Sequence, residues 1–82
     1  MDVAKAFGIV LRDMRIEAGM TQEQLGLEAD LRRTFVSLLE LGQQQPTLTT
    51  LIKLAHALKC PAHEIVAKFE KSMQIMHGDE SS

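Results

Sequence analysis

Three side chains late in the sequence are of the kinds that bind zinc. His56, Cys60 and His63 stand close together, and imidazole and thiolate are common zinc ligands. However, Pro61 interrupts the helical spacing between them, and no fourth ligand is obvious. The sequence also lacks a motif that would support a Ser/His/Asp or Cys/His catalytic arrangement, and it has no glycine loop for phosphates. We therefore expect no metal, no cofactor and no enzymatic activity.

Two adjacent arginines and two hydroxyl side chains offer a different chemistry. The guanidinium groups of Arg32 and Arg33 can each donate two hydrogen bonds at once, a geometry that matches O6 and N7 of guanine. Thr34 and Ser37 follow at a spacing that keeps them near Arg33 on one helix face. Because such residues on an arbitrary helix are usually just solvated, their role depends on the elements that present them.

Apolar residues at helical spacing predict the first of these elements. Steps of three and four residues place one apolar stripe on a first helix, formed by Val3, Phe7, Val10, Leu11 and Met14. Gly19 is a natural C-terminal stop. A short second helix is predicted from about Gln22 to Ala29, because Thr21 followed by Gln24 is a capping-box pattern.

A tight turn and a third helix follow. Asp30 stands where the turn needs a left-handed residue, a conformation that glycine supplies best and aspartate tolerates. The third helix begins near Arg32 and ends before Gly42. Its spacing turns three residues inward, namely Val36, Leu39 and Glu40. The polar residues 43–46 then form a loop.

Two further helices complete an all-α, five-helix architecture without strands. Thr47 or Thr49 caps the fourth helix, whose apolar stripe is Leu51, Leu54, Ala55 and Leu58. Pro61 opens the fifth helix, because proline is tolerated in a first turn. The fifth stripe comprises Ile65, Val66, Phe69, Met73 and Met76, and a four-helix core cannot cover all of it, which predicts a partner. Residues 1–76 are thus one domain, and residues 77–82 are expected to be a disordered polar tail.

The charge of the chain argues weakly against nucleic acid as a partner. The net charge is −2 and the isoelectric point about 5.8, whereas neutralising phosphates supplies most sequence-independent affinity. The distribution of charge matters more than the sum. From Leu41 through His63 the chain has Lys53 and Lys59 but no acid.

Residues 22–41 carry the pattern that two short helices meeting at a steep angle require. Gly26 is the small residue where the helices touch and Asp30 is the turn, while the apolar offsets are occupied by Leu25, Ala29, Leu31, Val36 and Leu39. Together with its flanks, the chain from about Phe7 to Val66 resembles the lambda-repressor/Cro-like (XRE-type) helix-turn-helix family. The resemblance rests on FGIVLRDMRIEAGMTQEQLG, RTFVSLLELG and QPTLTTLIKLAHALKCP. The run from Arg33 to Ser37 is also similar to the recognition helices of restriction-modification controller proteins.

The resemblance implies a DNA-binding lambda-repressor-like domain whose third helix enters the major groove. On that basis the residues expected to contact bases are Arg32, Arg33, Thr34 and Ser37. Those expected to contact the DNA backbone are Gln22, Phe35, Gln43 and Gln44. Relatives often carry Lys or Arg in the loop, so its glutamines predict a weaker dependence of affinity on salt. Leu38 and Leu41 also depart from the family, and they either touch thymine methyl groups or sugars or simply pack.

The resemblance further implies a structural ion pair, and the apolar stripe of the fifth helix predicts a dimer. Arg15 and Glu40 are similar to a pair that joins the first and third helices and holds the recognition helix at its angle. Ile65, Phe69, Met73 and Met76 are expected at a homodimer interface, with the earlier residues of that stripe also sealing the core; the alternative is that Ile65 and Phe69 only close the core of a monomer.

These expectations combine into a dimeric transcriptional regulator that binds a palindromic operator in double-stranded DNA. It would act as a repressor, or as an activator if placed beside RNA polymerase. A single cysteine and the absence of an apolar span favour a reducing cytoplasm and no membrane insertion. The resemblance implies a bacterial or phage protein located at the nucleoid. The competing interpretation is a helix-turn-helix protein-interaction module or antitoxin, which the net acidity, Leu38, Leu41 and the glutamine loop favour.

Overall fold

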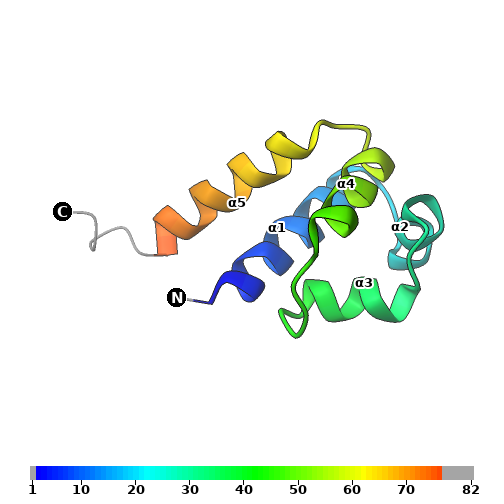
Figure 1. Cartoon of the computed structure of the whole chain (residues 1–82), viewed down its shortest axis with the longest axis horizontal. Coiled ribbons are helices and arrows are strands. Elements are labelled where there is room, and N and C mark those ends of the chain that lie inside the picture. Colours follow the sequence, from blue (N-terminus) through cyan, green and yellow to red (C-terminus); the bar gives the residue numbers. More distant parts are fainter. Residues whose placement is uncertain (1, 77–82) are drawn as a thin grey trace.

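Five α-helices follow one another along the chain and are joined by short turns and one longer loop (Figure 1). The structure is a computed structural model that describes residues 2–76, with side chains described through residue 74. The helices are α1 (Val3–Glu17), α2 (Gln22–Ala29), α3 (Arg33–Glu40), α4 (Leu48–Ala57) and α5 (Ala62–Met76). The predicted all-α, five-helix architecture is therefore confirmed. Residues 77–82, for which a polar tail was predicted, lie outside the described residues.

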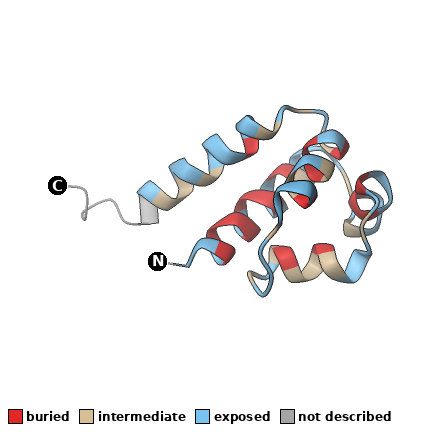
Figure 2. Ribbon diagram, viewed as in Figure 1, coloured by how far each residue is buried: buried red, intermediate tan, exposed pale blue. Residues whose placement is uncertain are grey.

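The core forms where α1 packs on α3 and α5 and where α2 packs on α3 and α4. Its largest fully buried side chains come from all five elements, namely Leu11, Leu25, Val36, Leu39, Leu54 and Ile65. Figure 2 shows that buried residues follow the inner side of α1 and recur on α2, α3 and α4, whereas α5 is mostly exposed. The helical spacing of the apolar residues thus identified most of the core, whereas Val3, 41% exposed, and Val66, 37% exposed, lie outside it.

The turn between α2 and α3 has the predicted chemistry. Asp30 has φ 57° and ψ 48°, the left-handed conformation that ends α2. Gly26 lies where the two helices touch, because a Cβ atom placed on it would come within 2.7 Å of the backbone oxygen of Leu31. Both residues therefore allow the steep crossing of α2 and α3 that a helix-turn-helix motif requires.

Thr47 and not Thr49 caps α4, because its Oγ1 accepts a hydrogen bond from the backbone N–H of Thr50. Beyond α4 the chain turns at Lys59, whose φ of 58° is also left-handed, and α5 then returns alongside α1 (Figure 1). The sequence pattern did not predict the left-handed Lys59, since lysine has no special preference for that conformation.

Candidate nucleic-acid interface

One face of α3 is turned away from the core and carries the predicted base-contacting side chains. Arg33 and Thr34 in the first turn are exposed, and Ser37 one turn later is half-buried. Arg32, also exposed, is the N-cap residue of α3, and its side chain makes no capping hydrogen bond. The guanidinium groups therefore stand at the start of a short helix, the part that docks deepest toward base edges in helix-turn-helix proteins.

The opposite face of α3 holds the helix to the core. Val36 and Leu39 are fully buried, and Phe35 is half-buried against the same core cluster. Packing is thus a role that Phe35 has in the free protein, and its contact with the DNA backbone stays a prediction. The two turns of α3 therefore carry one face that packs against the core and another that is exposed to solvent.

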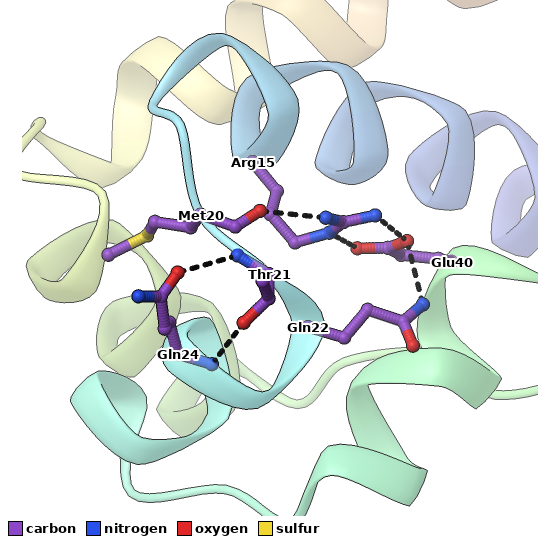
Figure 3. Close-up of polar contacts among 6 residues, drawn as sticks. All are labelled: Arg15, Met20, Thr21, Gln22, Gln24 and Glu40. Atoms are coloured by element: carbon purple, nitrogen blue, oxygen red, sulfur yellow. Dashed lines mark hydrogen bonds and ion pairs between the residues drawn. The ribbon is translucent and has the colours of Figure 1, made fainter.

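An ion pair fixes the end of α3 to α1 (Figure 3). Arg15 Nε lies 2.6 Å from Glu40 Oε2, and Arg15 Nη2 donates to Glu40 Oε1 at 3.1 Å. Only 12% of the Arg15 side chain and 3% of the Glu40 side chain is exposed. The hydrogen bond to Glu40 raises the pKa of the Arg15 guanidinium against the opposing effect of burial. The pair is therefore a bidentate, charge-assisted contact of the stronger kind.

The same carboxylate also receives a third donor, which the sequence reasoning missed. The side-chain amide of Gln22 donates to Glu40 Oε1 at 3.1 Å, and Arg15 Nη1 donates to the backbone oxygen of Met20 at 2.8 Å (Figure 3). The network thereby joins α1, the start of α2 and the end of α3. Gln22 was expected to face a phosphate, and in the free protein one of its amide N–H groups points to Glu40 instead.

The start of α2 nevertheless keeps the features of an anion site. Thr21 Oγ1 accepts from the backbone N–H of Gln24, and the Gln24 side chain accepts from the backbone N–H of Thr21, so the predicted capping box is present (Figure 3). The backbone N–H groups of Gln22 and Glu23, in the first turn, have no intrahelical acceptor, as in any helix. Exposed Glu23 adds a negative charge at the same place.

A close backbone contact sets the distance between α1 and α3. A Cβ atom on Gly8 would lie 2.5 Å from the backbone oxygens of Leu39 and Glu40, so α3 can approach this closely only because residue 8 has no side chain. Gly42, with φ 75°, likewise approaches the backbone of Lys5. Spacing analysis gave no sign of the role of Gly8, because it lies inside a helix and not at a turn.

Charge on this side of the molecule is sparser than the sequence suggested. Gln43 and Gln44, the expected backbone contacts after α3, are exposed and uncharged. The Lys53 ammonium lies 3.7 Å from the carboxylate of Asp30, so part of the positive charge expected between residues 41 and 63 is offset locally. Arg32 and Arg33 supply exposed positive charge at the start of α3.

The expected dimer residues separate into two groups. Ile65 is 0% exposed within a single chain, so it seals the core, as expected for the early residues of this stripe, and its place at a dimer interface stays a prediction. Phe69 and Met73 are half-buried, and Val66 is exposed. The side chain of Met76 lies outside the described residues.

The described residues form neither a metal site nor a membrane-spanning helix. Within residues 2–74, no three His, Cys, Asp or Glu side chains come together as a metal site would require. Burial and the nearby Glu64 carboxylate raise the pKa of the Cys60 thiol, which disfavours the thiolate form that metals bind. Among the helices of that region, none has both the length and the apolar character needed to cross a membrane.

Comparison with known proteins agrees with this geometry. A helix-turn-helix family model matches residues 11–65. The chain is 33% identical over 72 residues, 88% of its own length and 94% of the relative, to the uncharacterized HTH-type transcriptional regulator y4dJ of Sinorhizobium fredii. It is 38% identical over 53 residues to control protein C.BamHI of Bacillus amyloliquefaciens, covering 63% of this chain and 65% of that protein.

A solved structure adds a match in three dimensions. The crystal structure of the restriction-modification controller protein C.AhdI from Aeromonas hydrophila superposes with a TM-score of 0.74 at 35% identity, over 76% of this chain and 94% of that one. The family resemblance predicted from the sequence is confirmed. The chain belongs to the helix-turn-helix family of DNA-binding transcriptional regulators.

Proposed function

We propose that the protein binds a palindromic operator in double-stranded DNA as a homodimer, with Arg33 reading a guanine in each half-site. The observation that carries the proposal is the exposed start of α3, where Arg33 and Thr34 stand free while the end of the same helix is tied down through Glu40. A guanidinium held on a fixed helix can make a bidentate contact with O6 and N7 of guanine. Arg32 and Ser37 add contacts to bases beside it.

The backbone contacts of the proposed complex come from the elements that flank α3. The free N–H groups at the start of α2 favour a phosphate there through the helix dipole. Exposed Gln43 and Gln44 and the outer edge of Phe35 supply further contacts after and within α3. These contacts set the register of the protein on the duplex and carry no base information themselves.

The proposed dimer uses the face of α5 that its own core leaves uncovered. Val66, Phe69 and Met73 follow one another at helical spacing, and Ile65 is the one buried residue among the described side chains of α5. Val66 and Phe69 also line an apolar groove of about 180 Å³ with Val3, Pro46 and Leu51. A two-fold pairing of this surface would bury apolar area that is otherwise exposed to water.

Regulation follows from where such a dimer sits on DNA. We propose that it represses by occupying its operator in the bacterial cytoplasm, and that it activates where the operator places it against RNA polymerase. The relatives named as a control protein and as a restriction-modification controller protein support a role as a controller. Because occupancy rises with the concentration of the dimer, the protein's own level is the simplest signal.

Selection of binding sites from random duplex DNA tests the proposal. The expected product is a palindrome with half-sites about one helical turn apart. On that site Arg33→Ala should lose about 1–3 kcal/mol of binding free energy. Lys71→Ala is the matched control, since it removes the same charge from exposed α5, which packs on α1 and not on the reading face (Figure 1).

Failure of the selection would favour a second candidate function, a protein-interaction module. The observation in its favour is the exposure of two leucines away from the core, 78% for Leu27 on α2 and 81% for Leu48 at the start of α4. If no sequence is enriched, and any binding to DNA is equal for wild type and Arg33→Ala, the DNA-reading proposal is wrong.

A further inference from the structure

The outward face of α3 changes character along its length. Its first turn presents Arg33 and Thr34, and the last presents Leu38 and Leu41. Thr34, Leu38 and Leu41 follow one another at steps of four and three, so they form one continuous stripe, which Arg33 flanks at the start of the helix. This face is charged and polar at the start of the helix and purely apolar at its end.

The two leucines are not explained by packing within the chain. Leu41 is 59% exposed. It is the C-cap residue of α3 and follows buried Leu39 by only two positions. Leu38 is half-buried but lies outside the core cluster that includes Val36 and Leu39. One exposed and one half-buried leucine beside the proposed base-contacting residues would gain from a ligand with an apolar group.

DNA offers one such group in the major groove. The C5-methyl of thymine is the apolar feature of the base edges there, and side chains without polar atoms recognise it by contact. Cytosine lacks this methyl group and presents an amino donor that a leucine cannot satisfy. A leucine pair on the reading stripe therefore selects thymine and penalises cytosine in the bases that it faces.

We propose that Leu38 and Leu41 contact thymine methyl groups, so that each half-site contains a guanine read by Arg33 and one or more thymines read by the end of α3. The inference rests on the proposed DNA-reading function and adds the base class for the second half of the stripe. We assign this apolar surface to DNA and not to a protein partner, because it adjoins Arg33, Thr34 and Ser37 on the same face of α3.

Replacing thymine with deoxyuridine tests the contact, because the exchange removes the methyl group and keeps the base pair. Each thymine of the selected operator is replaced in turn, and affinity is measured for the full-length wild type, Leu38→Ala and Leu41→Ala. With wild type, at least one position in each half-site should lose about fourfold in affinity for each methyl removed. With the alanine variant of the leucine that contacts this methyl group, removing the methyl group should leave the affinity almost unchanged.

Two controls separate this contact from general effects. Leu48→Ala removes a still more exposed leucine from outside α3, and its deoxyuridine penalties should equal those of wild type. Leu41→Met, which keeps an apolar side chain, should keep most of the penalty. Circular dichroism melting shows whether half-buried Leu38→Ala remains folded, and exposed Leu41→Ala tests the inference in either case.

The possible outcomes distinguish this inference from the function on which it rests. If Arg33→Ala weakens operator binding but deoxyuridine penalties are absent, or are the same for wild type and both alanine variants, the leucines do not read thymine and only this inference is wrong. If no operator is selected and Arg33→Ala has no effect, the proposed function is wrong as well.

Discussion

Glu40 is the residue on which the reading helix depends most directly. It accepts two hydrogen bonds from Arg15 and one from Gln22, and it is almost fully removed from water. A buried carboxylate is tolerable only when its charge and its lone pairs are satisfied. The three donors meet that need and join three helices at a single side chain.

The exchange Glu40→Gln tests that dependence. It keeps the size of the side chain but leaves the Arg15 guanidinium without its counter-charge, so we expect a loss of about 3 kcal/mol in the free energy of unfolding. Urea denaturation followed by circular dichroism measures the change. Glu70→Gln, at an exposed position of α5, is the control and should have a wild-type midpoint; equal midpoints for both variants would contradict the role of Glu40.

Some of these features could be predicted from residue types, and others could not. Asp30 was predictable as a left-handed turn residue, and Thr21 with Gln24 as a capping box, because both depend on interactions over a few residues. The pair of Arg15 and Glu40 came from the family resemblance, since twenty-five positions separate the two residues. The bond from Gln22 to Glu40 depends on how three helices pack, and no local pattern encodes it.

Among the elements, α1 and α3 are brought together by the absence of a side chain. Gly8 allows the backbone oxygens of Leu39 and Glu40 to approach α1 more closely than any other residue would permit. The helix periodicity correctly placed Phe7 and Leu11 in the core on either side of it. It could not predict the close contact at Gly8, because glycine has no side chain and so does not contribute to an apolar pattern.

The exchange Gly8→Ala has an expected sign opposite to that of helix propensity. Alanine in a helix is favoured over glycine by about 1 kcal/mol. Here its Cβ atom would overlap backbone that cannot rotate away, and we expect a net destabilisation of about 1–3 kcal/mol together with weaker operator binding as α3 shifts. Thermal melting decides the matter, because a rise in Tm would mean that the close contact is not needed.

For the whole molecule, the apolar stripe of α5 divides into a part that packs in the core and a part that is available to a partner. The sequence predicted a stripe longer than the core, and the structure assigns its first member, Ile65, to the core. Spacing alone could not make this division, because it identifies a face of a helix and not the point at which neighbouring helices stop covering it.

The exchange Val66→Glu tests the proposed dimer. Two copies of the new carboxylate would face each other across a two-fold axis, so we expect monomers in sedimentation at micromolar concentration and loss of affinity for the full palindrome. Binding to an isolated half-site should remain. Ala67→Glu adds the same charge at the neighbouring exposed position and should stay dimeric; a dimeric Val66→Glu would place the interface elsewhere.

The division of α3 into a fixed face and a free face also bears on how new targets are acquired. Val36, Leu39 and Glu40 secure the helix, while Arg33, Thr34 and Ser37 take no part in that attachment. Surface substitutions of this kind usually change stability by less than about 0.5 kcal/mol. Variants randomised at those three positions should therefore remain folded, and the protein could be retargeted to other DNA sequences without any redesign of its scaffold.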